Sequence, residues 1–136
     1  MGLGWTVNLD KQGYFVGRRA LEREHREGSS WQLAGLEIDW EGLEREYAAV
    51  GMPPQVPASA VRGSIPVYTG PRQVGYASTS TWSPVLKKYI ALVHLQQPYS
   101  APGMKVEIEV TVEHHRRKSP ATVVKLPFYD PEWKKK

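Results

Sequence analysis

The chain has 136 residues, of which 40% are hydrophobic and 24% charged, and this composition is typical of one globular domain rather than a disordered or collagen-like protein. It contains no cysteine, which excludes a disulfide framework, a thiol nucleophile and a thiolate metal site, so we expect a cytoplasmic protein. The formal net charge is +4, with net −2 in residues 1–68 and net +6 in residues 69–136. Because residues 116–118 and 134–136 supply most of this excess, the charge alone does not indicate a nucleic-acid partner.

We expect no membrane partner. The longest apolar run, residues 89–93, is much shorter than the roughly 18 residues that indicate a membrane span. The first residues lack the basic flank and the apolar stretch of a signal peptide.

The N-terminal region is expected to form a strand and a helix. Residues 5–9 alternate apolar and polar side chains, as a half-buried strand does. Residues 17–27 carry charges at a spacing of four, with only Ala20 and Leu21 apolar, so we expect a solvated helix with a narrow buried stripe. Gly28 is expected to end this helix in the left-handed conformation.

Two short strand patterns and a second helix follow. The apolar residues of 31–33 have odd numbers and those of 36–38 have even numbers, which predicts a bulge at residues 34–35. Asp39 is expected to cap a helix whose apolar residues share one face: Leu43, Tyr47 and Val50. The proline-rich residues 51–60 should then form an extended connection.

The second half of the chain is rich in strand patterns. Residues 69–72 are typical of a hairpin turn, and residues 105–113 alternate strictly between apolar and polar side chains. Residues 89–95 are apolar at both alternating positions, as in a strand covered on both faces. Further strands are expected at residues 65–67, 74–76 and 121–126. The chain should therefore be mainly β, an antiparallel barrel or sandwich with two helices near its N-terminus.

No catalytic residue and no metal site is predicted. His114 and His115 are adjacent at an expected strand end, so they point to opposite faces and do not readily chelate one ion together. His94 lies in a buried strand, where a structural histidine with satisfied hydrogen bonds is favoured over a catalytic base. The carboxylates of the second helix are expected to be solvated: Glu41, Glu44 and Glu46.

Residues 114–118 (HHRRK) form a basic cluster whose role the sequence leaves open. In a small barrel such a cluster resembles a nucleic-acid surface in outline. It follows an acidic strand face, however, and no aromatic residues alternate with the basic ones as base stacking requires. A solvated hairpin end is favoured, with a polyanionic small ligand or an acidic partner domain as alternatives.

Residues 78–81 are four consecutive hydroxyl side chains that lead to Trp82 and Ser83. We interpret this segment as a tight turn whose Trp82 covers one end of the barrel. A contact with a ligand or with another domain is the alternative interpretation.

Three motifs resemble, in order and spacing, the C-terminal part of the aminomethyltransferase family, the T-protein of the glycine cleavage system. They are residues 4–21 (GWTVNLDKQGYFVGRRAL), 74–92 (VGYASTSTWSPVLKKYIAL) and 123–131 (VVKLPFYDP). The resemblance implies an antiparallel six-stranded β-barrel with one or two short N-terminal helices. Residues 29–136 would be the family's C-terminal β-barrel domain, and residues 1–28 a connecting strand and helix from a missing N-terminal folate-binding domain.

The resemblance also implies a function. In the family reaction, an aminomethyl group on a lipoyl-carrying protein passes its carbon to tetrahydrofolate and releases ammonia. Tetrahydrofolate is bound mainly by the N-terminal domain, and the barrel helps to close the cavity, so the expected partners are that domain and the lipoyl carrier protein. The isolated chain is expected to be inactive. Trp82, Ser83 and Tyr129 are expected to face the missing domain, because a turn aromatic and a tail aromatic are otherwise exposed.

Two departures from the family pattern leave alternatives open. Thr81 stands where many members have glycine, and residues 39–57 are longer than the usual linker. The chain could therefore be the barrel of a dimethylglycine or sarcosine dehydrogenase or of a folate-dependent demethylase. The alternative from another class is a stand-alone module that binds nucleic acid or an acidic protein.

Overall fold

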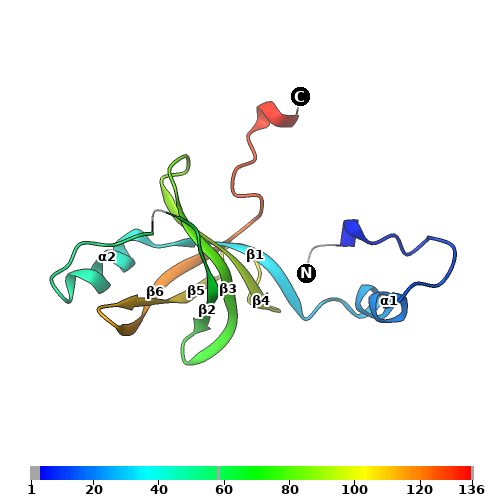
Figure 1. Cartoon of the computed structure of the whole chain (residues 1–136), viewed down its shortest axis with the longest axis horizontal. Coiled ribbons are helices and arrows are strands. Elements are labelled where there is room, and N and C mark those ends of the chain that lie inside the picture. Colours follow the sequence, from blue (N-terminus) through cyan, green and yellow to red (C-terminus); the bar gives the residue numbers. More distant parts are fainter. Residues whose placement is uncertain (1–3, 58, 136) are drawn as a thin grey trace.

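The protein folds as a closed, six-stranded antiparallel β-barrel, which confirms the predicted fold (Figure 1). The computed structural model describes residues 4–57 and 59–135. Around the barrel the strands follow the order β1-β4-β3-β2-β5-β6, and β6 pairs with β1 to close it. The strands are β1 (Trp31–Ile38), β2 (Val61–Thr69), β3 (Arg72–Ser83), β4 (Lys88–Gln96), β5 (Lys105–Val112) and β6 (His115–Val124).

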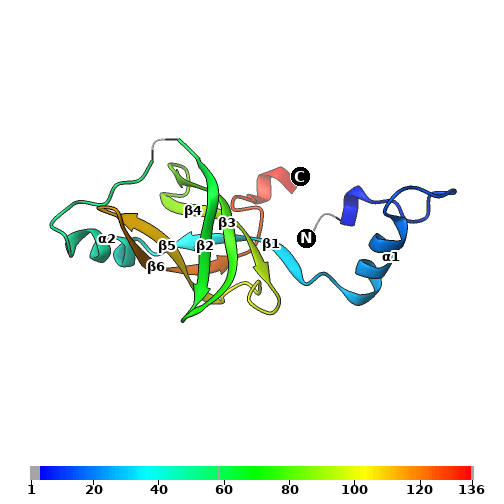
Figure 2. The same cartoon turned by 60° about the horizontal axis from the view of Figure 1, so that its bottom comes forward.

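The described residues form two α-helices and two 3-10 helices beside the barrel: α1 (Arg18–Glu27), α2 (Trp40–Ala48), η1 (Gly4–Thr6) and η2 (Glu132–Lys135). Figures 1 and 2 show α2 at one side of the barrel and α1 beyond the opposite side, joined to the barrel by the chain that enters β1. No helix formed by the described residues is long and apolar enough to span a membrane.

The barrel interior is filled by apolar side chains, which alternate along the strands with side chains on the outer face. The alternation predicted for residues 105–113 is confirmed over β5, Lys105–Val112, whereas Glu113 already lies in the following turn. Complete burial of a Val or Leu side chain is worth about 1.5–3 kcal/mol, so the interior is the main source of the barrel's stability. The fully buried residues of the interior include Leu36, Val67, Val74, Val93 and Leu95.

β1 is one continuous strand, so the predicted bulge at residues 34–35 is wrong. Its register with β4 is unbroken along its whole length. The apolar residues of β1 switch from odd-numbered to even-numbered positions because both faces of this strand are covered. Leu36 and Ile38 fill the core, whereas Trp31 packs near the Tyr76 ring, with ring centroids 6.1 Å apart.

α2 packs against one end of the barrel and begins where the sequence predicts. The Asp39 carboxylate accepts a hydrogen bond from the Gly42 N–H at 3.1 Å, which confirms the predicted cap. Leu43 and Tyr47 are buried with Val112 in a second apolar cluster. The described part of the connection from α2 to β2 contains no strand, as expected from its prolines.

The N-terminal region differs from three predictions. The strand expected at residues 5–9 is wrong, because η1 occupies its start and no described residue before β1 is in a strand. The region lies apart from the barrel, so no neighbouring strand pairs with it (Figure 1). For the same reason α1 buries none of its residues, and the expected buried stripe is absent. Gly28 ends α1 with a φ of 82°, but its ψ of 155° lies outside the left-handed helical region.

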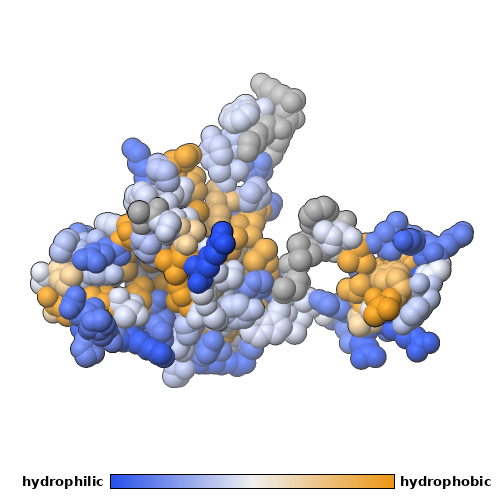
Figure 3. Space-filling view, viewed as in Figure 1, coloured by the Kyte–Doolittle hydropathy of each residue, from blue (hydrophilic) through white to orange (hydrophobic). Residues whose placement is uncertain are grey.

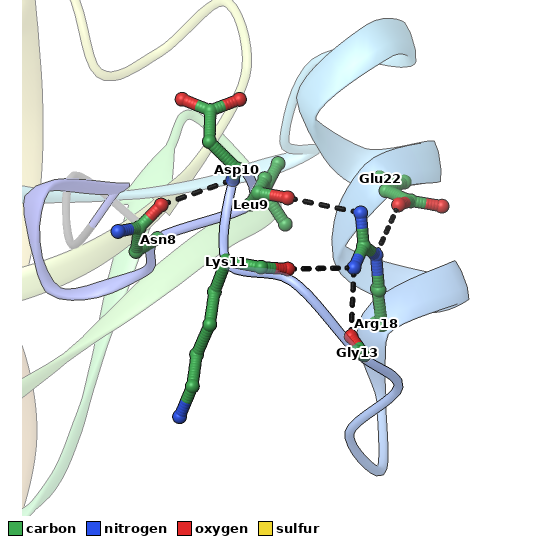
Figure 4. A network of polar contacts seen from close by, with 7 residues as sticks. All are labelled: Asn8, Leu9, Asp10, Lys11, Gly13, Arg18 and Glu22. Carbon is green, nitrogen blue, oxygen red and sulfur yellow. Dashed lines mark hydrogen bonds and ion pairs between the residues drawn. The ribbon is translucent and has the colours of Figure 1, made fainter.

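Arg18 ties the loop before α1 to the helix (Figure 4). Its guanidinium donates hydrogen bonds to the carbonyl oxygens of Leu9, Lys11 and Gly13 at 2.8–3.0 Å. It also donates to the Glu22 carboxylate at 2.7 Å, one turn further along α1. A planar group with five N–H donors can serve all four acceptors at once. The α1 segment, residues 4–28, therefore has its own polar framework.

The turn predicted at residues 78–81 is wrong, because these residues belong to β3. The pairing of β3 with β4 is interrupted by an irregularity between Ala77 and Thr79, and the chain turns only at residues 84–87. The hydroxyl side chains therefore lie along a strand, and their turn-forming tendency is overridden by the pairing of β3 with β2 and β4.

β6 begins earlier than the strand predicted at residues 121–126. A two-residue turn at Glu113 and His114, with φ of 49° and 64°, joins it to β5. Pairing resumes at once, with Val112 opposite His115. The basic cluster is therefore placed mostly in a strand and not in a loop.

Candidate functional site

Trp82 lies at the end of β3, next to the start of α2. Its ring meets the Trp40 ring edge to face, with centroids 5.2 Å apart and an interplanar angle of 64°. Tyr89 is its partner on β4. The hydroxyls of Tyr89 and Ser80 are 3.2 Å apart. Trp82 is therefore half-buried at this end of the barrel.

Ser83 and Tyr129, the other two predicted site residues, occupy different places. The Ser83 hydroxyl accepts a hydrogen bond from the Leu86 N–H at 3.3 Å, which stabilises the turn between β3 and β4. Tyr129 lies in the C-terminal tail and is 47% exposed. The residue before it, Phe128, packs over Gly35 on the outer face of β1. The tail and the β3–β4 turn leave the barrel on the same side in Figure 1.

An open groove of about 640 Å³ runs from Trp40 and Trp82 over the outer face of the barrel. Its floor crosses four strands that are neighbours in the barrel, β4, β1, β6 and β5. Basic residues outnumber acidic ones along its lining. The basic residues are Arg45, Lys87, Lys88 and Lys105, and the acidic ones are Glu37 and Asp39.

Both acidic residues of the groove have partners within the protein. The Glu37 carboxylate is 2.6 Å from Lys88 Nζ, and the Asp39 carboxylate caps α2. Lys105 Nζ donates a hydrogen bond to the Thr122 hydroxyl at 2.8 Å, a neutral acceptor. The groove therefore keeps an excess of positive charge.

The sequence did not reveal the groove, because its residues come from distant parts of the chain. Trp40 and Arg45 belong to α2 and Lys105 to β5. They meet only through the strand register, which places Lys105 opposite Thr122 and Thr122 opposite Glu37. No local pattern signals this arrangement.

Carboxylates compensate three cations of the basic cluster, residues 114–118. The ion pairs are Arg116–Glu109 (3.7 Å), Arg117–Glu46 (3.3 Å) and Lys118–Glu107 (3.8 Å). Lys118 also lies over the Tyr68 ring, 4.2 Å from its centroid. The predicted solvated hairpin end therefore covers residues 113–116, which are exposed, whereas Arg117 and Lys118 are half-buried.

The titratable side chains that the structure describes show no cluster of three His, Asp or Glu residues that could hold a metal ion. His94 stacks on Tyr76 with centroids 5.0 Å apart. Its Nδ1 is buried without a hydrogen-bond partner among the described residues, which contradicts the expectation of a fully satisfied histidine. Burial raises the pKa of the Tyr47 phenol, and the nearby Tyr89 adds to this effect.

The α1 segment leaves apolar side chains uncovered. Tyr14 is 76% exposed and Val16 is 94% exposed. Figure 3 shows hydrophobic atoms gathered on the face of this segment. Exposed apolar patches of this kind mark contact surfaces.

A small closed barrel with an open charged groove and an α1 segment that exposes Tyr14 and Val16 defines a barrel domain with surfaces for contact. The chain belongs to the family of glycine cleavage T-protein C-terminal barrel domains, whose family model matches residues 48–130.

Curated relatives agree with this assignment. An aminomethyltransferase of Prochlorococcus marinus (strain NATL2A) is 34% identical over 128 residues, which cover 94% of this chain and 29% of that protein. The aminomethyltransferase of Bacillus pumilus (strain SAFR-032) is 30% identical with the same coverage. The chain thus spans about three tenths of the length of the relatives it matches.

A solved structure shows the same fold. The crystal structure of glycine cleavage system aminomethyltransferase T from Bartonella henselae matches 93% of this chain and 30% of that chain, with a TM-score of 0.67 and 17% identity.

Proposed function

We propose that the chain serves as the C-terminal barrel of a tetrahydrofolate-dependent aminomethyltransferase and helps to close the cavity in which folate and the aminomethyl carrier meet. The observation that carries this proposal is the match of aminomethyltransferases to 94% of the chain, which itself spans only 29% of their length. Residues 1–28 would connect to an N-terminal folate-binding domain, and residues 29–136 would form the barrel domain. The names of the relatives favour aminomethyl transfer over the dehydrogenase and demethylase alternatives.

The uncovered α1 segment supports a contact with another domain. It holds its own shape through Arg18 but exposes Tyr14 and Val16 to solvent. Covering these side chains would gain the free energy of apolar burial without any rearrangement of the barrel. We propose that the N-terminal folate-binding domain packs against Tyr14 and Val16.

Trp82, Ser83 and Tyr129 are the proposed contacts between the barrel and that domain. Transfer from the carrier to folate requires both reactants to be held side by side, and a domain that closes the cavity contributes to this without supplying an acid or a base. By the family resemblance, folate itself would be held mainly by the N-terminal domain. The lipoyl carrier protein would deliver its arm to the same cavity. A cysteine-free chain is compatible with a cytoplasmic location.

The test compares the 136-residue chain with a protein in which the same barrel is joined to its folate-binding domain. Both are incubated with tetrahydrofolate and an aminomethyl-lipoyl carrier, and ammonia release is measured. We expect release by the joined protein and none by the chain alone. Turnover by the chain alone would contradict the proposal.

A further inference from the structure

We propose that the groove beside Trp40 and Trp82 binds an acidic peptide segment of a partner protein. This inference goes beyond the proposed function and does not depend on it. The two share Trp82, so the variants that locate the binding change Arg45 and Lys87, which the proposed function does not involve.

The groove presents cations that the protein does not neutralise. Arg45 and Lys87 form no ion pair with any residue that the structure describes. Lys105 contacts only the neutral Thr122 hydroxyl among the described acceptors. A ligand with several carboxylates would give these uncompensated cations partners of opposite charge.

The spread of these cations favours an extended chain over a single small anion. Lys105 starts β5, and Lys87 immediately precedes β4, three strands away in the barrel order. Three strand spacings correspond to about 14 Å measured around the barrel wall. About four to five residues of extended peptide cover this distance, whereas a single phosphate or carboxylate is much smaller than it.

The tryptophan pair adds an apolar end to the groove. Trp40 is 39% exposed, and its edge-to-face contact with Trp82 fixes both rings. Aromatic side chains contribute a large contact area at little cost in side-chain entropy, as they do in antibody paratopes. The groove thus combines an aromatic end with dispersed cations on the outer barrel face.

The test is an NMR titration of the isotope-labelled chain with hexaglutamate, with hexaglutamine and inorganic phosphate as comparison ligands. We expect saturable shifts with hexaglutamate at the indole N–H groups of Trp40 and Trp82 and at the Thr122 amide. Hexaglutamine should cause none, because its neutral side chains do not pair with the cations. Added salt should weaken hexaglutamate binding, because exposed charges are screened.

Two matched variants locate the binding. Arg45→Gln/Lys87→Gln should weaken hexaglutamate binding about tenfold, because each exposed ion pair is worth about two- to fivefold. Arg62→Gln/Lys125→Gln also removes one arginine and one lysine, but outside the groove, and should change hexaglutamate binding by less than about twofold. All four side chains are exposed, so the barrel should fold in both variants.

Three results would overturn the proposal. The first is the absence of saturable shifts with hexaglutamate. The second is equal weakening in the two variants, which would show general attraction to a basic protein. The third is displacement by phosphate at the concentration of hexaglutamate, which would show a site for a single small anion.

Discussion

Gly35 on β1 lies directly beneath the ring of Phe128 in the C-terminal tail. A Cβ atom at Gly35 would be 2.6 Å from Phe128 Cε1 and 2.9 Å from Val124 Cγ2. Because Gly35 has no side chain, it leaves room for the Phe128 ring to pack against the outer face of β1. This contact fixes the position of the tail on the barrel. The final motif of the family resemblance, residues 123–131, therefore has a packing role.

Gly35→Ala should lower the free energy of unfolding by about 1–3 kcal/mol, because the added methyl group overpacks the contact with Phe128. Urea unfolding of the chain measures this change. In a Phe128→Ala background the same substitution should cost less, since its main neighbour is gone. If Gly35→Ala lowers the free energy of unfolding equally in both backgrounds, the contact between Gly35 and Phe128 is contradicted.

Arg18→Lys should loosen the loop before α1 without changing the thermal stability of the barrel. Lysine keeps the charge but cannot donate to Leu9, Lys11, Gly13 and Glu22 from one planar group. Hydrogen exchange of the amides in residues 9–13 should become faster, and the Tm of the barrel should stay the same. A lowered Tm would show that the α1 segment supports the barrel.

Stability should decline at high pH through Tyr47. Burial raises the pKa of the Tyr47 phenol above its ordinary value of 10.0, with the nearby Tyr89 adding to this effect. The unfolded chain releases this proton near pH 10, and the folded chain only at higher pH, so the contribution is full below about pH 10 and is lost as pH rises through the folded pKa.

The check for Tyr47 is a comparison of urea unfolding between about pH 9 and about pH 11. Wild-type stability should fall more steeply than that of Tyr47→Phe, which has no phenol to ionise. If the free energy of unfolding falls equally with pH in the two proteins, Tyr47 is not the source of the pH dependence.

The ion pairs of the basic cluster predict little binding of nucleic acid. Arg116, Arg117 and Lys118 each lie within 4.0 Å of a carboxylate, which would have to be displaced by a phosphate. In a salt titration with a random-sequence oligonucleotide, Arg116→Gln/Arg117→Gln/Lys118→Gln should therefore bind about as well as the wild-type chain. Tight wild-type binding at low salt that this variant loses would support a nucleic-acid surface at the basic cluster instead.

Features set by neighbouring residues could be predicted from the sequence. The alternation of β5 and the cap at Asp39 depend on residues within a few positions of each other. The hairpin turn between β2 and β3 is also local, with Gly70 at a φ of 58°. The family resemblance then supplied the barrel itself, which periodicity alone did not separate from a sandwich.

Features set by distant residues could not be predicted. The parity change in β1 looked like a bulge because nothing in its own sequence shows that Phe128 and Tyr76 cover its outer face. The ion pairs of residues 116–118 depend on the register of β6 and on the position of α2. Trp82 was recognised from the sequence, but its partner Trp40 was not, because only the fold brings them together.

Kinetics of the joined protein, in which the barrel is attached to its folate-binding domain, test the central claim most directly. We predict that Trp82→Ala/Tyr129→Ala lowers kcat/KM for tetrahydrofolate by about tenfold or more, because a loosely closed cavity misplaces the reactants. Tyr68→Ala, which removes an aromatic side chain whose hydroxyl donates a hydrogen bond to the Glu109 carboxylate on β5, should leave kcat/KM unchanged. Unchanged folate affinity and turnover in Trp82→Ala/Tyr129→Ala would contradict the account.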